Sequence, residues 1–427
     1  MYKISNISIS GFWGLHQVKT KIDSFTNIFI GKNGSGKTTF INIIQSVLTV
    51  ELLSLSNLQF DSVVINLSDG SHKRKITVTK TLDDIGYSSI EYQIGTSKYR
   101  IPYNLIREIK LYGNRIRGLS QRYYREVEEI KKQINKLVNV SYLSVYRDEI
   151  KKSDNAIQNR DENHNSINTR LNKLMSELTA YQLQLENDLL IESKSFQENV
   201  LRTMLYNEEF DHIDISKKKS IDIDSARQGL RQAYKGLGIL DTKTAEVIEK
   251  HVKAIEKATR GINNHVTLKV GLSVQDITPI TLLNRTRRII ELSDSLEETK
   301  KRIMRPLNQF IEILNSFHDS KIFEFPRDKN RTIVIKKEDN DIQVSELSSG
   351  EKQLMILLTE SLLQKNSQTL YIADEPELSL HIEWQRKLLP SIKQINPNSQ
   401  IIIATHSPEI VGKLKEYTIN MEGIIDG

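Results

Sequence analysis

The chain has 427 residues and a formal net charge of +6, and 27% of its residues are charged. It contains no cysteine, which excludes disulfides and thiolate metal sites. No apolar run approaches the ~20 residues of a membrane-spanning helix, and the first ten residues lack the apolar core of a secretory signal. We therefore expect a cytoplasmic protein of two or three structural units that does not act in a membrane.

The first 150 residues read as half of an α/β domain. Ile4, Ile7 and Ile9 alternate with polar residues, which predicts a strand. The following runs predict, in order, strands at 18–22 and 28–30, a helix over 37–55, a β meander over 60–101, a helix over 104–138 and a buried strand at 140–146.

The middle of the chain, residues 151–320, is rich in Asn, Gln, Lys, Glu and Ser. Leu171, Leu174 and Leu178 recur there at helical spacing, which predicts a long helix or helical hairpin that is partly coiled-coil-like. A second pair of helices is expected over 241–265 and 282–317. We expect this whole segment to be a mainly helical insertion.

Residues 321–427 return to an α/β pattern. A hairpin near 332–344 is followed by a helix over 351–364, a strand at 370–373, a helix over 382–395 and a strand at 401–405. Such alternation predicts a parallel sheet. Residues 1–150 and 321–427 are then the two halves of one α/β domain, a mixed sheet with an antiparallel β lobe, which the insertion interrupts.

A glycine-rich loop between a predicted strand and a predicted helix matches the phosphate-binding pattern of Gly, four residues, Gly-Lys-Thr. Backbone N–H groups of such a loop wrap a phosphate, and the following helix adds a favourable dipole. We expect Lys37 to reach the β- and γ-phosphates and the Thr38 hydroxyl to bind Mg²⁺. The expected nucleotide contacts are Asn33, Gly34, Ser35, Gly36, Lys37, Thr38 and Thr39.

Two acids directly follow the apolar run Leu370–Ala373. Paired carboxylates at the end of a buried strand cost free energy, so they are expected to serve a function. Asp374 suits the Mg²⁺ shell, and Glu375 suits the activation of the attacking water. His406 follows the next apolar run, where its imidazole is expected to contact the γ-phosphate or to order the water. Catalysis is thus assigned to Lys37, Glu375 and His406.

A second candidate anion-binding site directly precedes the helix that is expected over 351–364. Ser348 and Gly350 form a turn at its N-terminus, where backbone N–H groups favour phosphate. One nucleotide needs only one phosphate loop, so the second site is expected to bind the γ-phosphate of ATP held by another copy. The alternative, an ordinary N-cap in which a serine caps Glu351, stays open.

In chain order these runs resemble the Walker A, signature, Walker B and switch-histidine motifs of ABC-type ATPases. The signature reads Leu347-Ser348-Ser349-Gly350-Glu351, which is similar to the LSGGE form of the SMC, RecF and OLD branch, with Ser349 in place of the first glycine. Leu378–His381 resembles the D-loop. The resemblance implies that residues 1–150 and 321–427 form an ABC-type P-loop ATPase domain. It also implies ATP and Mg²⁺ as cofactors and a homodimer, or a higher homo-oligomer, with composite ATP sites.

Within that branch, the runs 140–147, 373–381 and 404–410 look like stand-alone bacterial anti-phage ATPases such as the AriA component of PARIS and the PtuA component of Septu. This resemblance implies a nucleotide-controlled sensor or scaffold that controls a separately encoded toxin or nuclease. The chain shows no Cys/His cluster of a nuclease, and little sequence follows His406. Any cleavage of nucleic acid is therefore expected from a partner.

Two alternatives remain at this stage. A repair or chromosome-maintenance ATPase of the RecF or SMC kind would bind DNA through the basic stretch 115–136, with Tyr123 and Tyr124 between its charges. A scaffold would use ATP mainly for assembly. The basic residues from Lys98 to Lys152 include Arg107, Lys110, Arg115, Arg117, Arg122, Arg125, Lys131, Lys132 and Lys136, and a solvated helix face explains them equally well. The pair Asp222 and Asp224 is read as a solvated turn.

Overall fold

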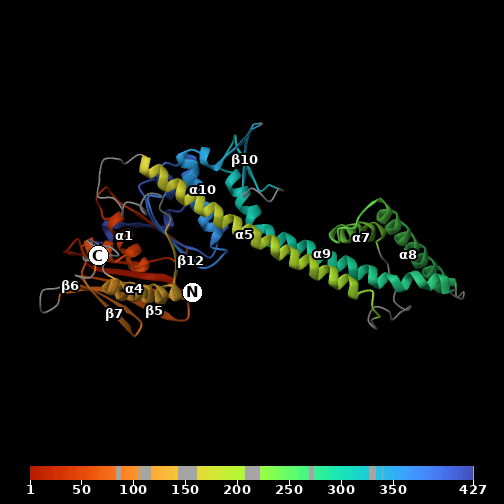
Figure 1. The fold of residues 1–427 in the computed structure, drawn as a ribbon, viewed down its shortest axis with the longest axis horizontal. Coiled ribbons are helices and arrows are strands. Elements are labelled where there is room, and N and C mark those ends of the chain that lie inside the picture. The colour runs from red at the N-terminus through yellow and green to blue at the C-terminus, as the bar shows by residue number, and fades with distance from the viewer. Residues whose placement is uncertain are drawn as a thin grey trace. The chain divides into compact units, whose positions relative to one another are not determined.

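A computed structural model describes residues 1–82, 88–103, 106, 117–142, 161–206, 222–268, 274–326, 333–338 and 340–426. The chain divides into two compact units. One unit combines Met1–Leu178 with Gln309–Gly427, and the other is Thr179–Asn308. In Figure 1 the red N-terminal strands and the blue C-terminal strands belong to the first unit, so the two ends of the sequence build one domain.

The first unit contains a six-stranded antiparallel sheet in the order β2-β1-β4-β5-β6-β7. Its strands are β1 Lys3–Phe12, β2 His16–Lys21, β4 Ser62–Ser68, β5 Lys73–Leu82, β6 Ser88–Ile94 and β7 Ser97–Pro102. Alternate residues of β4 are buried because one face of the sheet packs on the core. The β meander predicted over 60–101 is confirmed.

A second sheet consists of five parallel strands in the order β14-β3-β13-β12-β8. The strands are β3 Thr26–Ile30, β8 Asn139–Tyr142, β12 Thr369–Asp374, β13 Gln400–Ala404 and β14 Thr418–Asn420. The parallel sheet that the alternation predicted is therefore confirmed. Because the carboxyl ends of parallel strands meet at one edge, the loops that follow β3, β12 and β13 come together there.

One apolar core contains residues of both sheets, among them Ile7, Ile65, Ile372 and Ile402. Helix α1 (Lys37–Thr49) buries its apolar residues in the same core, where Phe40 packs on Phe29 of β3 with ring centroids 4.6 Å apart. This packing fixes the start of α1 next to the end of β3. The phosphate-binding pattern lies between these two elements.

The single helix predicted over 37–55 is wrong. Helix α1 ends at Thr49, and a second helix, α2, spans Leu52–Asn57. Val50 separates them with φ +57°, and its N–H donates to the carbonyl of Ser46. A left-handed conformation is rare for a β-branched residue, so no propensity could have indicated the break.

Helix α4 spans Arg117–Leu137 and lies within the predicted helix over 104–138, most of whose earlier residues are outside the described ranges. Strand β8 follows it. The strand predicted at 140–146 is therefore present as far as Tyr142, but all four β8 residues are only half-buried, so its predicted burial is wrong there. Residues 143–146 lie outside the described ones.

The signature region begins with a small antiparallel sheet in the order β11-β10-β9. Its strands are β9 Ile322–Glu324, β10 Val334–Lys337 and β11 Asn340–Ile342. The predicted hairpin is thus present, with strands displaced by about two residues. The two helices expected after it are α10 Ser349–Leu363 and α11 Ile382–Ile395, and a short helix that was not predicted, α12, spans Pro408–Val411.

The second unit is helical throughout its described residues. Two 42-residue helices, α5 (Asp161–Arg202) and α9 (Val274–Asn315), reach into it, and α7 (Ile223–Gly236) and α8 (Thr242–Leu268) complete it. Phe196 and Val200 of α5 pack with Ala233 of α7 and Leu296 of α9. Helices α8 and α9 confirm the predicted second helix pair.

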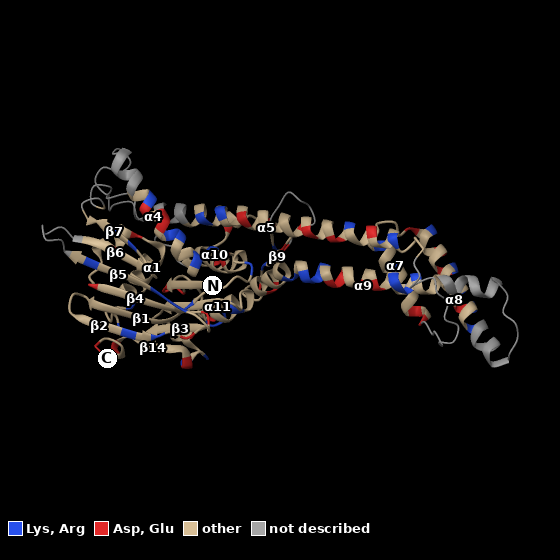
Figure 2. Cartoon of the chain, turned by 90° about the horizontal axis from the view of Figure 1, so that it is seen from below, with Lys and Arg blue, Asp and Glu red and all other residues tan. Residues whose placement is uncertain are grey.

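Figure 2 shows that α5 and α9 carry both signs of charge along their length. No helix among the described residues is both long enough and apolar enough to span a bilayer.

Candidate functional site

The phosphate-binding loop connects β3 to α1. Gly34 and Gly36 have φ +79° and +92°, values that favour glycine. A Cβ at Gly36 would lie 2.9 Å from the Phe12 ring and 3.0 Å from the Trp13 ring. Any side chain at position 36 would thus collide with the turn after β1. The tight loop explains why glycine stands at these positions.

Lys37 is buried beneath this loop. Its Nζ donates to the carbonyls of Gly31 at 2.8 Å and Lys32 at 2.9 Å. Burial lowers the pKa of the Lys37 amine, although the nearby charges of Glu375 and Asp374 oppose that shift. The structure thus brings the predicted phosphate-binding lysine to the two predicted acids.

Thr38 and Asp374 lie side by side although 336 residues separate them in sequence. The Thr38 hydroxyl donates to Oδ1 of Asp374 at 3.3 Å. A hydroxyl and a carboxylate oxygen at this spacing are the hard oxygen ligands that Mg²⁺ prefers. The two residues fit an Mg²⁺ ion bound together with a nucleotide phosphate.

Glu375 and His406 follow the neighbouring strands β12 and β13. Glu375 has φ +49°, and its N–H still donates to the carbonyl of Ala404 at 2.9 Å. The left-handed conformation turns the Glu375 side chain away from Asp374. Nε2 of His406 lies 3.7 Å from Oε1 of Glu375, and both side chains are partly exposed. The pair therefore faces solvent next to the candidate Mg²⁺ ligands.

The loop that carries His406 is held by a residue that the sequence reasoning did not single out. The buried carboxylate of Glu377 accepts hydrogen bonds from the Thr405 hydroxyl and from the N–H groups of His406 and Ser407. The only sequence signal was an acid two residues after Glu375 in a run noted for its resemblance.

Ser348 is the N-cap of α10. Its side chain accepts from the Glu351 N–H, and the Glu351 carboxylate accepts from the Ser348 N–H at 2.8 Å. Burial alone would raise the pKa of Glu351, but hydrogen bonds from Lys321 and Ser348 lower it. The alternative that was left open, an ordinary cap, is thus present in the geometry.

Gly350 is the second residue of the same helix. A Cβ on Gly350 would stand 2.5 Å from the carbonyl oxygen of Ser379. In the described part of the chain, no hydrogen bond or ion pair joins Ser348 or Gly350 to the phosphate-binding loop. The structure therefore gathers Lys37, Thr38, Asp374, Glu375 and His406 at one site, to which the described residues show no hydrogen bond from the signature residues.

Trp13 is a second residue that sequence reasoning missed as a site residue. It stands in the turn after β1 with φ +56°, its side chain is 37% exposed, and its ring borders Gly36. The aromatic pair at 12–13 was visible in the sequence, but only as the end of a strand. An exposed indole beside a phosphate loop can contact a bound nucleotide.

Of the two tyrosines in the stretch that the repair alternative assigns to DNA binding, one is buried. Tyr123 is 9% exposed and belongs to the core, whereas Tyr124 is 47% exposed. Helix α4 also carries acids, and Lys131 pairs with Glu128 at 3.8 Å. Arg107, Lys110 and Arg115, and the side chains of Arg117 and Arg122, lie outside the described residues.

The acidic pair in the second unit is a helix cap rather than a turn. Asp222 is the N-cap of α7 and accepts from the N–H of Asp224. Both residues are exposed, and the described residues include no group of three potential metal ligands. The expected solvated turn is therefore corrected to a helix N-cap.

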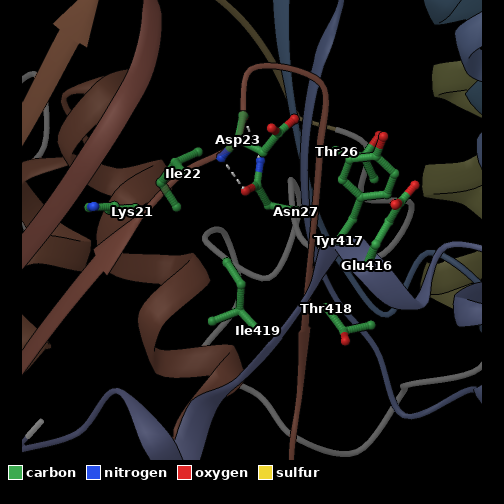
Figure 3. A pocket seen from close by; sticks show the side chains of 9 residues that line it. All are labelled: Lys21, Ile22, Asp23, Thr26, Asn27, Glu416, Tyr417, Thr418 and Ile419. Carbon is green, nitrogen blue, oxygen red and sulfur yellow. Dashed lines mark hydrogen bonds between the residues drawn. The ribbon is translucent and has the colours of Figure 1, made fainter.

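An open depression of about 460 Å³ lies elsewhere on the first unit (Figure 3). It is lined by Lys21, Ile22, Asp23, Thr26, Asn27, Glu416, Tyr417, Thr418 and Ile419. Asp23 and Asn27 hydrogen-bond each other there, with Asp23 N donating to Asn27 Oδ1 at 2.7 Å. None of its lining residues belongs to the phosphate-binding loop, so this depression is separate from the candidate site.

Comparison with solved structures finds Smc head domains. An Smc head with an extended coiled coil from Pyrococcus furiosus matches with a TM-score of 0.42 and 16% identity, over 100% of this chain and 95% of that one. A second, from Pyrococcus yayanosii, matches with a TM-score of 0.40 and 14% identity, over 96% of this chain and 93% of that one.

Sequence comparison finds curated relatives. The Retron Ec83 probable ATPase of Escherichia coli is 22% identical over 99% of this chain and 71% of its own length. The Retron Vc95 probable ATPase of Vibrio cholerae is 23% identical over 33% of this chain and 34% of its own length. Septu protein PtuA of Bacillus thuringiensis is 34% identical over 18% of this chain and 23% of its own length.

The resemblance that the sequence motifs indicated is confirmed by these curated relatives and by a family model. The model described as AAA ATPase domain matches residues 2–411, which is nearly the whole chain. With its mixed α/β fold and its phosphate-binding loop, this chain belongs to the AAA ATPase domain family and is an ATPase.

Proposed function

We propose that the chain binds ATP with Mg²⁺ between the phosphate-binding loop and the ends of β12 and β13, and hydrolyses it there. The contact between Thr38 and Asp374 carries this proposal because it joins two predicted Mg²⁺ ligands from opposite ends of the chain. Bound Mg²⁺ neutralises charge on the phosphates. Asn33 to Thr39 would contact the nucleotide through the loop backbone and side chains.

The residues around that contact take the other roles in ATP binding and hydrolysis. Lys37 holds the β- and γ-phosphates, and Glu375 accepts a proton from the attacking water. His406, 3.7 Å from Glu375, orients that water or contacts the γ-phosphate. The reaction therefore depends mainly on positioned charges, as expected for phosphoryl transfer.

We further propose that two copies of the chain sandwich two ATP molecules. Ser348 is exposed at the N-terminus of a 15-residue helix and makes no hydrogen bond to its own phosphate-binding loop within the described residues. Its helix start can thus complete the site of a second copy, where the helix dipole favours a phosphate. The capping hydrogen bond of Ser348 is compatible with this role.

In the cell, we propose a nucleotide-controlled sensor or scaffold of a bacterial anti-phage system that controls a separately encoded toxin or nuclease. The likeness to retron ATPases and to Septu protein PtuA supports this proposal. Because its substrate is ATP, we propose the cytoplasm as the location. The second unit would transmit the ATP state or bind the effector.

Variants of Lys37 and Glu375 test the enzymatic proposal. Lys37→Ala should abolish nucleotide binding, and Glu375→Gln should bind ATP but hydrolyse it about 10²–10⁴-fold more slowly, because it lacks the base. Binding is measured by equilibrium dialysis with labelled ATP and hydrolysis by phosphate release. Hydrolysis by Glu375→Gln at the wild-type rate would disprove the base assignment.

Co-purification with the neighbouring gene product tests the cellular proposal. A stable complex whose ATPase rate ignores DNA supports the sensor. Stimulation by DNA that fades with added salt, without any complex, would instead favour a repair ATPase.

A further inference from the structure

We propose that Glu377 is a positioning residue for ATP hydrolysis, which fixes the His406 loop and links that loop to the signature helix α10. This inference rests on the proposed roles of Glu375 and His406. It assigns a function to a carboxylate that takes no part in the mechanism above.

The first half of the argument is the contact between two loops. Glu377 follows β12 and is 7% exposed, whereas Thr405 to Ser407 follow β13. One oxygen, Oε1, accepts from the Thr405 hydroxyl and from the N–H groups of His406 and Ser407, the latter two at 3.3 Å. Three donors that converge on one oxygen define the path of the loop.

The position of His406 depends on that path. Its own N–H is one of the three donors, so the Glu377 carboxylate is directly bonded to the residue that faces Glu375. Without this acceptor, the His406 N–H would lose its hydrogen bond, whereas the Ser407 N–H would keep the Thr405 hydroxyl at 2.9 Å. The imidazole would then no longer be held 3.7 Å from Glu375.

The second half of the argument is the link to α10. Gln353, which is 3% exposed, donates from Nε2 to the carbonyl of Pro376 at 3.0 Å. Gly350 of the same helix meets the carbonyl of Ser379 without room for a side chain. Residues 376–379 are thus held by α10 on one side and by the His406 loop on the other.

The geometry therefore connects two half-sites within one chain. If α10 completes the ATP site of a second copy, any shift of its start moves Pro376, then Glu377, and through it His406. The catalytic pair of one site would respond to nucleotide held at the other.

The second oxygen of Glu377 suggests a suitable probe. Oε2 is buried and has no hydrogen-bond partner in the described structure. Burial raises the pKa of the Glu377 carboxyl, although the three donors oppose the shift. A glutamine at this position keeps the accepting oxygen and is neutral, so it should preserve the loop.

The experiment compares Glu377→Leu with Glu377→Gln in the full-length chain. The leucine variant should lower kcat by about 10- to 100-fold, because a shift of about 1 Å at a catalytic group costs that much. Its KM for ATP should be little changed, since the phosphate-binding loop is untouched. Glu377→Gln should restore most of the rate, and Glu383→Leu, at an exposed acid of α11, serves as the matched control.

A double variant separates positioning from general destabilisation. If Glu377 acts through His406, then Glu377→Leu should cost little more in a His406→Ala background. The inference is overturned if Glu377→Leu keeps the wild-type kcat, or if its loss is fully additive with that of His406→Ala.

Two precautions keep the test decisive. Should Glu377→Leu fail to fold, Thr405→Val removes one of the three donors and should lower kcat in the same direction. Failure of the proposed function itself is recognised separately, because Glu375→Gln would then hydrolyse ATP normally whatever the Glu377 variants do.

Discussion

At the scale of single residues, the site is organised by contacts between residues that are far apart in sequence. Asp374 lies 3.3 Å from the Thr38 hydroxyl, and both charges of the acidic pair act on the buried Lys37 amine. A buried amine and two carboxylates at one sheet edge form an arrangement whose charges balance only in part. A bound Mg²⁺ ion would offset the excess negative charge of the two carboxylates.

Asp374→Asn tests the metal half of this arrangement. The amide should bind Mg²⁺ more weakly, so the Mg²⁺ concentration for half-maximal hydrolysis should rise at least about tenfold. Titration of Mg²⁺ at saturating ATP measures this. An unchanged requirement would remove Asp374 from the metal shell.

Trp13 offers a direct signal of nucleotide binding. Its partly exposed ring borders Gly36, so nucleotide binding should change its fluorescence. Trp384 is the other tryptophan, which makes Trp384→Phe the natural control. The response to ATP should persist in Trp384→Phe and disappear in Trp13→Phe, and the reverse pattern would contradict the assignment.

The sequence allows some of these residues to be identified and not others. Lys37 and Thr38 stand in one short motif with fixed spacing, and Asp374 ends an apolar strand, so local pattern suffices. Glu377 acquires its partners only when β12 and β13 pair, because Thr405 lies 28 residues away. No local pattern contains that contact.

At the scale of elements, the start of α10 is the most constrained feature of the first unit. Ser348 and Glu351 cap it reciprocally, Lys321 pairs with Glu351, and Gly350 touches Ser379. Such a start cannot move alone. A shift of α10 would carry the segment after β12 with it.

Gly350→Ala should therefore be destabilising. A methyl group 2.5 Å from the Ser379 carbonyl forces a displacement that costs roughly 1–3 kcal/mol, so thermal unfolding should begin several degrees lower. Gly423→Ala is the matched control, because a Cβ there meets nothing within 4 Å. Equal unfolding temperatures for both variants, measured by differential scanning fluorimetry, would contradict the crowding argument.

The elements themselves were predictable to the extent that periodicity reports burial. The strands of the meander and the alternation after residue 349 follow the pattern of buried residues. The break at Val50 and the burial of Tyr123 did not follow from it, because tertiary packing decides both. Val50 adopts a conformation that its residue type disfavours, and Tyr123 lies in a helix whose charged face suggested exposure.

At the scale of the whole molecule, we predict that two copies of the chain pair when ATP binds. The reason is that, within the described residues, no hydrogen bond links Ser348 or Gly350 to the phosphate-binding loop of the same chain. Glu375→Gln should run near its 49.2-kDa chain mass without nucleotide and near twice that mass with ATP and Mg²⁺. Ser348→Arg should prevent the change because a bulky cation repels the helix N-terminus and blocks the interface. Light scattering after size-exclusion chromatography measures both, with Ser71→Arg in an exposed turn as the matched control.

The order of the parallel sheet has a consequence for biosynthesis. Strand β3, which leads into the phosphate-binding loop, pairs only with β13 and β14 among the described strands. The Asn27 side chain of β3 also donates to the carbonyl of Ile401, which lies 374 residues further along the chain. At about 5–20 residues per second, a ribosome needs roughly 20–75 s to supply it. A nascent or truncated chain therefore lacks a formed ATP pocket. The ATP pocket can therefore form only after β13 has been synthesised.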